Sequence, residues 1–438
     1  MPTGLGAPDH ELWLPVQTRS VSAMCGVAPT SGSRRGAMQG ALDDIRVIEY
    51  AEMVSGPICG KMFSDLGAEV IKIEAPGAGD PARQYPPFPD DQSHPERSGM
   101  FLYLNTGKKS LTLDPATPAG SEVFKRLVAR ADFLIENHPV GFLERIGFSY
   151  PTLRALDPRL IVVSITPFGQ TGPYRDWKGS DLIEWAMSLT GYNTPTLIDD
   201  GERENPLRAP GHIADVMGGT NAAAAAMMAL FQRELTGDGQ WIDAPCWQAT
   251  VNTSKIEMAA YSYLGIPFSR MRGQTLVGLE PMACRDGYVY TLWAADSHYQ
   301  ALKKLLGSPD GLDTELFDTL TGRQQNDDVL RAVIREELKK YDMKYLVDEG
   351  QKLGLTIGPV YRVSQAANHP HLAARDAFVA IDHPVAGRFL YPRQMVSMTA
   401  TPAIPSRAPM LGEHNKEILD SLAIPREEQH GLHAAGVI

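Results

Sequence analysis

The sequence predicts an α/β fold with a doubly wound parallel sheet, and three observations lead to this prediction. From Arg46 onward, short apolar segments typical of strands alternate with segments of helical periodicity. Pro57 and Gly67 stand near the start and just after the end of one predicted helix, where these residues are favoured. The segment RLIVVSITPFG, residues 159–169, is continuously apolar in its centre, as expected of a strand buried on both faces.

Two strand and helix units can be placed before that buried strand. The first consists of RVIEY (46–50), the turn AEMVSG (51–56), the helix PICGKMFSDL (57–66) and the strand EVIKIE (69–74). The second consists of KSLTLD (109–114), the amphipathic helix PAGSEVFKRLVARA (118–131) and DFLIEN (132–137). Because crossover connections are right-handed, consecutive strands of such units lie parallel in one sheet.

Ligands of doubly wound sheets bind at the carboxyl ends of the strands. We therefore expect the informative residues to be those that follow each strand, namely Met53, Val54 and Ser55, then Asn137 and His138, then Phe168, Gly169 and Gln170. The turn at Ser55 departs from a P-loop in its first glycine and in the residue after Lys61, and no G-x-G-x-x-G follows a strand. These departures argue against a nucleotide triphosphatase and a nicotinamide dehydrogenase, but a phosphate-bearing ligand at the Pro57 helix N-terminus is still allowed.

Composition limits the class of protein. The chain has 438 residues, of which 43% are hydrophobic, so it can bury a sizeable core and is expected to form two domains. A net charge of −11 without a run of Lys or Arg argues against nucleic-acid and membrane-surface partners. The longest apolar run, residues 222–231, is about half as long as a membrane span, so no membrane association is expected.

The cysteine and histidine patterns predict neither disulfides nor a metal site. The four cysteines lie far apart and form no C-x-x-C pair, which suits a reducing cytoplasm. No H-E-x-x-H motif and no cluster at zinc spacing is present. The predicted location is therefore cytoplasmic, and the predicted metal content is none.

Residues 1–40 are rich in Gly, Ser, Pro and Ala without periodicity, and we predict that they form a disordered extension. Folded structure should begin near Leu42. A transit peptide is a weaker interpretation because Asp9 and Glu11 are acidic. Natural translation from Met38 is another alternative.

Asp215 stands in an unusual segment, RAPGHIADVMGGTNAAAAAMMALFQREL, residues 208–235. It precedes the Gly218-Gly219 step, which would open a long alanine-rich helix. Aspartate is a good helix N-cap, so the local pattern alone favours a capping role. A chemical role for this carboxylate needs support from the rest of the chain.

That support comes from a set of motifs in a fixed order: VIEYAEMVSGPICGKMFSDLGAEVIKIEAPGAGDPAR, LNTGKKSLTLD, ADFLIENHPVGFLERIG, FGQTGPYRDWKGSDL, GHIADVMGG, TGDGQWIDAP and RAPMLGEH. From about Leu42 to Leu422 the chain resembles the class III CoA-transferases, the family of formyl-CoA transferase and carnitine CoA-transferase. The resemblance implies transfer of CoA from an acyl-CoA thioester to an acceptor carboxylic acid, with no permanently bound cofactor. It implies that Asp215 is the covalent nucleophile, which forms an aspartyl-CoA intermediate and is compatible with capping.

The resemblance also implies binding residues for the CoA thioester: the backbone of Met53, Val54 and Ser55, and the side chains of Leu113, Asn137, Arg145 and Lys178. Leu113 could equally be a core residue, and Asn137, Arg145 and Lys178 could be solvated surface groups. Arg83, in GDPAR, is a candidate for binding a phosphate or a substrate carboxylate. Asp181, in KGSDL, matches an acidic residue near the reaction centre of the family, or it caps the helix LIEWAMSL.

Three departures from the family pattern affect the expected substrate. Formyl-CoA transferase has Gln where this chain has Val54, which argues against formyl or oxalate chemistry. The family often has Arg where this chain has Ala75, so one adenine or phosphate contact is absent. The segment RMRGQTLVGLEP holds only Gly273 and Gly278, so the glycine-rich loop of formyl-CoA transferase is not evident.

Two alternative functions are compatible with these motifs, a racemase or isomerase and a non-catalytic CoA-binding protein. A 2-methylacyl-CoA racemase or isomerase needs two bases, and its branch of the family has His where this chain has Ser180, a poor base. A non-catalytic CoA-binding protein would tolerate loss of Asp215. Four aromatic residues either shape the acyl pocket or pack in the core: Trp177, Trp185, Tyr192 and Trp247.

The predicted organisation is a large Rossmann-like domain and a smaller α+β domain in an interlocked homodimer, the dimer being implied by the resemblance. The large domain spans residues 41–243 and is completed by residues 375–425. Residues 244–272 form a linker helix, 273–358 the small domain, 359–374 a return linker and 426–438 a C-terminal tail.

Overall fold

The computed structural model describes residues 40–195, 198, 204–267, 270, 280–393, 396–403 and 405–438. The predicted extension up to residue 39, Cys25, Gly273 and Gly278 lie outside these residues. The three cysteines that are described, Cys59, Cys246 and Cys284, are buried free thiols.

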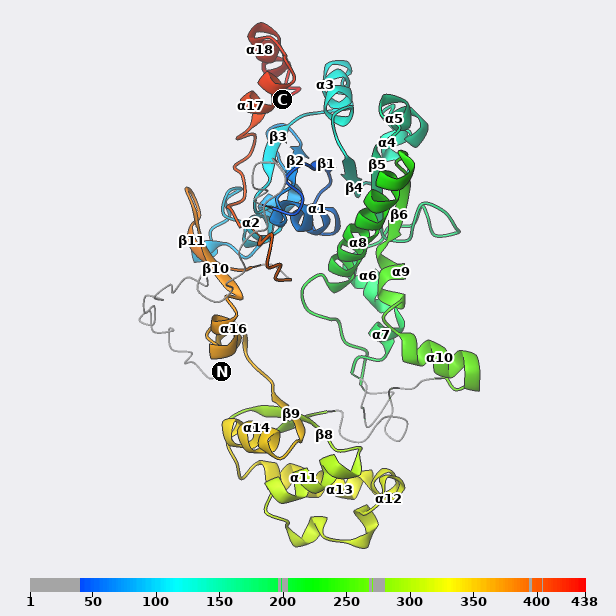
Figure 1. The fold of residues 1–438 in the computed structure, drawn as a ribbon, viewed down its shortest axis with the longest axis vertical. Helices are drawn as coiled ribbons and strands as arrows, with labels where there is room; N and C mark the ends of the chain where they lie inside the picture. The colour runs from blue at the N-terminus through cyan, green and yellow to red at the C-terminus, as the bar shows by residue number, and fades with distance from the viewer. Residues whose placement is uncertain are drawn as a thin grey trace, which may run out of the picture. The chain divides into compact units, whose positions relative to one another are not determined.

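Six parallel strands form the sheet that the sequence predicts. Their spatial order is β3-β2-β1-β4-β5-β6, so the chain runs outward from β1 in one direction and then returns beside it with β4 (Figure 1). The strands are β1 Arg46–Tyr50, β2 Glu69–Glu74, β3 Lys109–Thr112, β4 Phe133–Glu136, β5 Ile161–Thr166 and β6 Trp241–Pro245. This order places the change of direction between β1 and β4, where a ligand site is expected.

The first helix follows the predicted pattern with one shift. α1 spans Ser55–Asp65, so it begins two residues before Pro57. Pro57 is still in the first turn, where its missing N–H group costs no hydrogen bond. Gly67 follows the C-cap residue Leu66 with a φ of 102°, a conformation that favours glycine.

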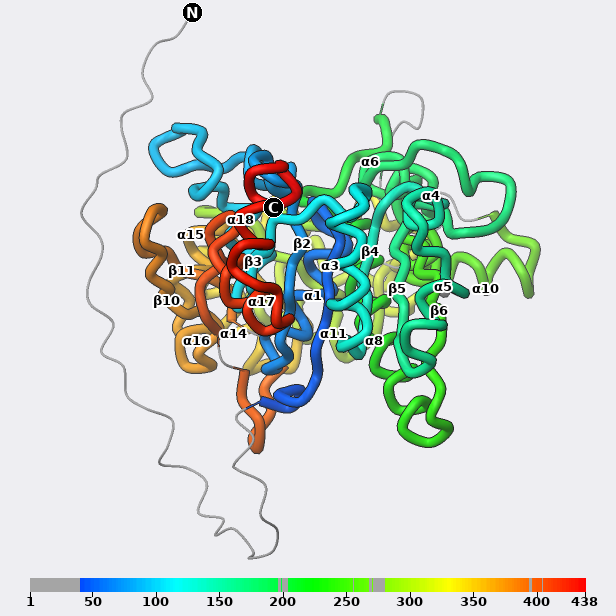
Figure 2. The backbone as a smooth tube through the Cα atoms, turned by 90° about the horizontal axis from the view of Figure 1, so that it is seen from above, coloured from blue at the N-terminus to red at the C-terminus, as the bar shows by residue number. Residues whose placement is uncertain are grey.

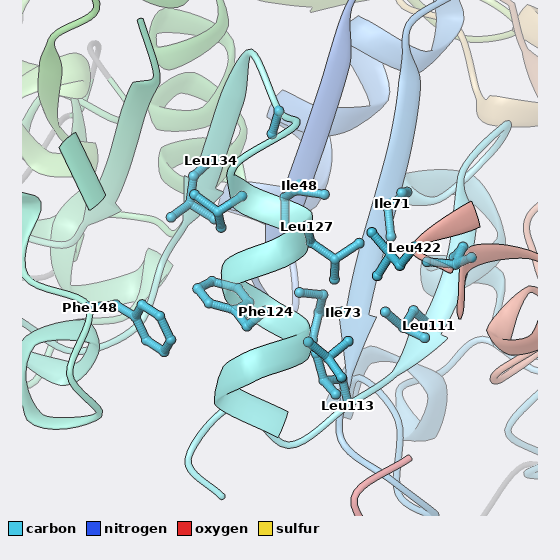
Figure 3. Packing of buried hydrophobic residues seen from close by; sticks show 14 of the residues in the cluster. Ile48, Ile71, Ile73, Leu111, Leu113, Phe124, Leu127, Leu134, Phe148 and Leu422 are labelled. Atoms are coloured by element: carbon cyan, nitrogen blue, oxygen red, sulfur yellow. The ribbon is translucent and has the colours of Figure 1, made fainter. Parts of the chain in front are cut away.

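Alternate strand residues pack into two separate buried clusters, one on each face of the sheet. On one face, Ile48, Ile71 and Leu134 pack with residues of α3 (Pro118–Val128), as Figure 3 shows. On the other face, Val47, Val70 and further strand residues pack against α1 and α8 (Ile213–Thr236). β4 and β5 are thus buried at every residue, as the continuous apolar character of residues 159–169 predicts for β5.

α8 is a long core helix. Its inward side consists of small residues, Ala222, Ala223, Ala226 and Ala229, which let the helix lie close to β5 and β6. It has 24 residues, and an 18-residue window within it has a mean hydropathy of 1.2, so by length and composition alone it could cross a membrane. The helix is therefore longer than the apolar run of residues 222–231, which by itself was too short for a membrane span. This is weak support for a span, because core helices of globular proteins also meet these criteria.

The C-terminal segment returns to the large domain. β10 (Phe378–His383) pairs with β11 (Gly387–Pro392), and α17 (Asn415–Ser421) lies beside β3 (Figure 2). The side chain of Asn415 accepts a hydrogen bond from Thr112 N. Residues 426–438, predicted as a tail, instead form α18 (Arg426–Ala434) and add Leu432 and Val437 to the core. The segment begins with the polar run REEQH (426–430), which made it look like a tail.

A smaller α+β unit has its own core. β7 (Pro281–Ala283), β8 (Tyr288–Leu292) and β9 (Thr356–Pro359) form an antiparallel sheet. Its helices are α11 Asp296–Leu305, α12 Leu320–Gln325, α13 Asp327–Leu338 and α14 Met343–Lys352, and its core includes Trp293, Tyr299, Leu302, Leu330 and Leu346.

The remaining elements connect these layers. Between the strands of the large sheet lie α2 Gly99–Leu104, α4 Phe142–Arg145, α5 Tyr150–Leu156, α6 Asp181–Ala186 and α7 Leu189–Tyr192, with two 3₁₀ turns at Pro81–Gln84 and Pro89–Asp91. Later in the chain lie α9 Cys246–Val251, α10 Lys255–Leu264, α15 Val363–Ala367 and α16 Pro370–Ala374, with 3₁₀ turns at Asp310–Leu312 and Glu315–Phe317.

Candidate functional site

Asp215 is the third residue of α8, not its N-cap. The N-cap is His212, which has a left-handed backbone and makes no side-chain capping bond. The first turn is capped instead by Asp181, whose Oδ1 accepts a hydrogen bond from Ala214 N at 2.8 Å and lies 3.5 Å from Asp215 N. Both capping interpretations from the sequence are therefore wrong, since Asp215 does not cap α8 and Asp181 caps α8 rather than its own helix.

The Gly218-Gly219 step allows close packing between helices. A Cβ atom on Gly218 would lie 2.3 Å from Cys246 Sγ, and one on Gly219 would lie 2.3 Å from the carbonyl oxygen of Ser55. Both glycines lie inside α8, where backbone N–H groups bond within the helix. The two N–H groups are therefore not available to an oxyanion, and the glycines serve to bring α8 against α1 and α9.

Asp215 belongs to a compact acidic cluster. Oxygen atoms of Glu184 and Asp215 and the sulfur of Cys246 all lie within 4.8 Å of one another. On the other side, His212 Nδ1 lies 3.3 Å from Asp215 Oδ2. The prediction that the chain has no metal site stays a prediction.

The environment raises the pKa values of the carboxyl groups of Asp215 and Glu184. Burial, with the charge of Asp181, raises the pKa of Asp215 from 3.8 to about 6, although His212 acts in the opposite direction. Burial and then the charges of Asp215 and Asp181 raise the pKa of Glu184 to about 8. At neutral pH, Asp215 is therefore ionised in most molecules while Glu184 keeps its proton.

Glu184, His212 and Cys246 were missed by the sequence analysis. α6 has an inverted pattern, because Asp181 and Glu184 are buried while Leu182 and Ile183 are 46% and 42% exposed. Two acids at i and i+3 therefore share the inward face, a spacing that can be read from the sequence. Cys246 follows β6 directly. The sequence analysis did not predict β6, so Cys246 was not among the predicted ligand positions after a strand.

The predicted residues after β1 and β4 do come together. Asn137 Oδ1 accepts a hydrogen bond from Glu52 N at 2.8 Å, and Asn137 Nδ2 donates to Glu52 O at 2.7 Å and to Ser55 Oγ at 3.1 Å. Ser55 also packs its carbonyl against Gly219. The turn after β1 thus connects the change of direction in the sheet to the helix that carries Asp215.

A buried network of charges holds the turn after β1 in place. Lys72 Nζ lies 3.0 Å from a carboxylate oxygen of Glu49 and 2.8 Å from one of Asp80, and it donates to the carbonyl of Ala51 at 2.7 Å. Asp80 Oδ1 accepts a hydrogen bond from Met53 N at 3.0 Å. Burial lowers the pKa of Lys72, but the two carboxylates more than offset this and place it above its usual range. Lys72 is therefore charged and holds the turn through Asp80.

Three other predicted binding residues are buried. Leu113 is 1% exposed and lies in the cluster with Ile73 and Phe124 (Figure 3), which argues against contact with adenine. Val54 packs with Ile58 and Leu104 and can offer its backbone only. These positions shape the fold near the predicted CoA site.

Arg83 is the third of these residues. Its guanidinium is fully buried, forms two hydrogen bonds to Glu74 at 2.7 and 2.9 Å, and contacts Glu96 at 2.7 Å. It also stacks 3.7 Å from the centre of the Phe101 ring. This arrangement argues against the predicted role as an anion ligand, because the positive charge is already neutralised by two carboxylates.

Arg145 and Lys178 are exposed and can reach a ligand. The Arg145 guanidinium lies 6.0 Å from the centre of the Phe142 ring, which packs against His138 after β4. Lys178 lies in the loop after β5, next to Trp177, which stacks on Tyr174 at 3.9 Å. The structure thus leaves both cations at the carboxyl ends of strands.

The four predicted aromatic residues divide into two anchored and two exposed side chains. Trp185 Nε1 donates to the carbonyl of Leu207, and Trp247 Nε1 donates to the carbonyl of Met187. Trp177 and Tyr192 are more than half exposed. Trp185 and Trp247 therefore act as packing residues, and Trp177 and Tyr192 are left to contact a ligand or another chain.

Comparisons with known proteins identify the family of the chain. Residues 42–415 match the model of CoA-transferase family III. The chain is 32% identical to the succinyl-CoA:D-citramalate CoA-transferase of Chloroflexus aurantiacus, over 91% of this chain and 98% of that protein. It is 34% identical to the succinyl-CoA:mesaconate CoA-transferase of Haloarcula marismortui, over 88% and 97% of the two chains.

A solved structure gives the same result. The CAIB/BAIF family protein from Brucella suis superimposes with a TM-score of 0.77 and 30% identity, covering 88% of this chain and 100% of that one. The resemblance stated from the sequence motifs is thus confirmed. The chain belongs to CoA-transferase family III and is a CoA-transferase.

Proposed function

We propose that Asp215 carries out the transfer as a covalent nucleophile. The observation that carries this proposal is the carboxylate of Asp215, held at the start of α8 in a buried cluster where its pKa of about 6 leaves it ionised and more basic than a free aspartate. A more basic carboxylate is a better nucleophile, and it is still charged at neutral pH.

The steps balance without an external base. An oxygen of Asp215 attacks the thioester carbonyl, and the C–S bond breaks to give a mixed anhydride and CoA thiolate. The thiolate then attacks the Asp215 carbonyl carbon and releases the donor acid as a carboxylate. The acceptor carboxylate attacks the carbonyl carbon of the resulting aspartyl-CoA thioester and gives a second mixed anhydride and CoA thiolate. The thiolate then attacks the acyl carbon of the acceptor, which forms the new CoA thioester and releases Asp215 as a carboxylate.

A trapping experiment tests the intermediate. The enzyme incubated with succinyl-CoA and then with hydroxylamine or borohydride should carry a modification on the peptide that contains Asp215, detected by mass spectrometry. Activated carboxyl groups react with these reagents, whereas a free carboxylate does not. Modification at Glu184 or Asp181 instead would contradict the assignment.

The proposed CoA site lies at the carboxyl ends of β1, β4 and β5. The backbone of residues 53–55, Asn137, Arg145 and Lys178 would contact the CoA moiety, while Leu113 and Arg83 are no longer included. Three features support this location: the start of α1 at Ser55 favours an anion, Asn137 is fixed against the turn, and the two cations are exposed.

Lys178→Ala and Arg145→Ala should each raise KM for the CoA thioester, and more strongly at low salt. A contact between an exposed cation and a phosphate is screened as ionic strength rises. We expect an increase of about threefold to tenfold near 20 mM salt, shrinking toward twofold at 500 mM. Lys125→Ala, on the solvent-facing side of α3, is the matched control. KM values that match the control at every salt concentration would remove both residues from the site.

For the substrates, we propose succinyl-CoA as donor and a short dicarboxylic acid as acceptor. Similarity to transferases named for citramalate and mesaconate supports this class. A screen of acceptors with succinyl-CoA and acetyl-CoA as donors tests the proposal, and oxalate as the best acceptor would contradict it.

We also propose a homodimer, in which a second copy covers an exposed apolar surface. On α8, Met228, Phe231 and Leu235 are each at least 70% exposed, and α10 exposes Ile256 and Tyr263 to a similar degree. Surfaces of this kind mark contacts with other chains. Light scattering after size exclusion should give twice the mass of one chain, and Phe231→Glu should reduce it. The cytoplasmic location stays a prediction.

A further inference from the structure

Glu184 lies in the reaction centre but takes part in none of the steps described above. Its side chain is 1% exposed, and among the described residues Oε2 has no hydrogen-bond partner. Buried polar atoms are almost always paired, so an unpaired one calls for an explanation. Glu184 also lies on the polar inner face of α6, opposite the exposed Leu182 and Ile183. The fold thus buries an acid where an apolar residue would be less costly.

The start of α8 offers few free donors to a reacting oxygen. Ala214 N donates to Asp181, Asp215 N points to the same carboxylate, and Val216 N donates to the carbonyl of His212. When CoA thiolate or an acceptor acid attacks the Asp215 carbonyl carbon, negative charge develops on a side-chain oxygen of Asp215. That charge needs a donor that the backbone of the first turn does not readily supply.

The surroundings of Glu184 keep its proton in place. Asp181 on α6, Asp215 on α8 and Cys246 on α9 face it, and none of them can carry positive charge. Two basic residues lie nearby, but the contact of His212 is with Asp215 and that of Arg208 is with Asp181 at 3.9 Å. Burial and the two carboxylates raise the pKa of Glu184 to about 8. A neutral carboxylic acid is a hydrogen-bond donor, whereas a carboxylate is not.

We propose that Glu184 is a protonated acid that donates a hydrogen bond to the oxyanion formed on the Asp215 carboxyl group during CoA transfer. This inference rests on the proposed role of Asp215 as nucleophile. As the new C–S or C–O bond forms, the carbonyl electron pair moves to the Asp215 oxygen. It returns when the leaving group departs. The proton stays on Glu184 throughout, so the step requires no other acid or base.

The test compares Glu184→Gln and Glu184→Leu over pH 5.5–9.5 with succinyl-CoA as donor and one fixed acceptor acid. In the native enzyme, kcat should rise as Asp215 ionises near pH 6 and should fall about tenfold per unit above pH 8, as Glu184 loses its proton. Gln is a neutral donor at every pH, so Glu184→Gln should lose the alkaline decline and keep kcat at pH 7 within about tenfold. Leu has no donor, so Glu184→Leu should lose about 100-fold in kcat, with little change in KM.

The native enzyme and Glu122→Gln, an exposed change on α3, control for titration of the substrates. An alkaline decline in Glu184→Gln that equals that of the native enzyme would overturn the inference, and so would a Glu184→Leu enzyme within threefold of native kcat. If Glu184→Leu does not fold, the profile of Glu184→Gln alone decides. Activity retained by Asp215→Asn would refute the nucleophile instead, so the two failures are distinguishable.

Discussion

Asp215→Asn is expected to lower kcat by about 10³-fold or more at pH 7.5, with the fold intact. Asn has nearly the same volume but cannot form the anhydride or the thioester that the proposed transfer requires. The change also spares the cap of α8, because Asp181 supplies it. Steady-state kinetics with succinyl-CoA measures the loss, and mass spectrometry should show no trapped adduct. Activity within tenfold of the native enzyme would rule out the covalent mechanism.

The same variant should be at least as stable as the native protein above pH 6. Since folding raises the pKa of Asp215 from 3.8 to about 6, the ionised group destabilises the folded state at high pH, by up to about 3 kcal/mol. This cost is absent below about pH 4, grows as pH rises to 6 and is complete above it. The melting temperature of Asp215→Asn should therefore exceed that of the native enzyme at pH 7.5 and match it near pH 4. A large decrease at pH 7.5 would point to a structural role.

Lys72→Met should produce the largest loss of stability. The lysine side chain and the carboxylates of Glu49 and Asp80 are essentially inaccessible to solvent. Removing Lys72 leaves the buried carboxylate of Asp80 without its cation partner, while Glu49 keeps its contact with Lys108 at 2.7 Å. We expect a cost of about 3–5 kcal/mol. We expect the melting temperature to fall by roughly 5–15 °C, measured by scanning calorimetry. KM for the CoA thioester should also rise, because Asp80 holds Met53 N in the turn.

Lys125→Met provides the comparison for this variant. Its ion pair with Glu122 is exposed, and such pairs contribute at most about 1 kcal/mol. A Lys72→Met protein that melts within 2 °C of this control would show that Lys72 is not needed to neutralise the buried carboxylates.

The sequence predicted the sheet because its signals are local. β1, β2, β4 and β5 are apolar runs of the expected length, and helix boundaries near Pro57 and Gly67 follow from backbone preferences. β6 escaped notice because its residues are mostly half-buried or exposed, so it lacks a continuous apolar run. The expectation that ligand-binding residues follow the strands pointed to Ser55 after β1 and Asn137 after β4. A hydrogen bond between their side chains confirms that the two segments meet.

The acidic cluster was harder to predict because tertiary contacts create it. Asp181 is separated by 34 residues from the backbone N–H group of Asp215 that it faces, so its capping role cannot be inferred from local sequence. Arg83 looked like an anion ligand because the residues that neutralise it, Glu74 and Glu96, flank it at a distance along the chain. The role of a single charged residue near a strand end therefore cannot be inferred until its ion-pair partners are known.

The contact between Gly219 and Ser55 has a consequence for altering the acids that this enzyme accepts. Because backbone meets backbone there, a larger residue at 219 would push α8 away from α1 and separate the carboxylate from the turn after β1. Substitutions at this contact between α8 and α1 are therefore not expected to make room for a larger acyl group. We expect room for a bulkier acid to come from positions whose side chains are free to change, and Trp177 and Tyr192 are exposed candidates. In directed evolution, productive substitutions should collect there and be absent from the two glycines.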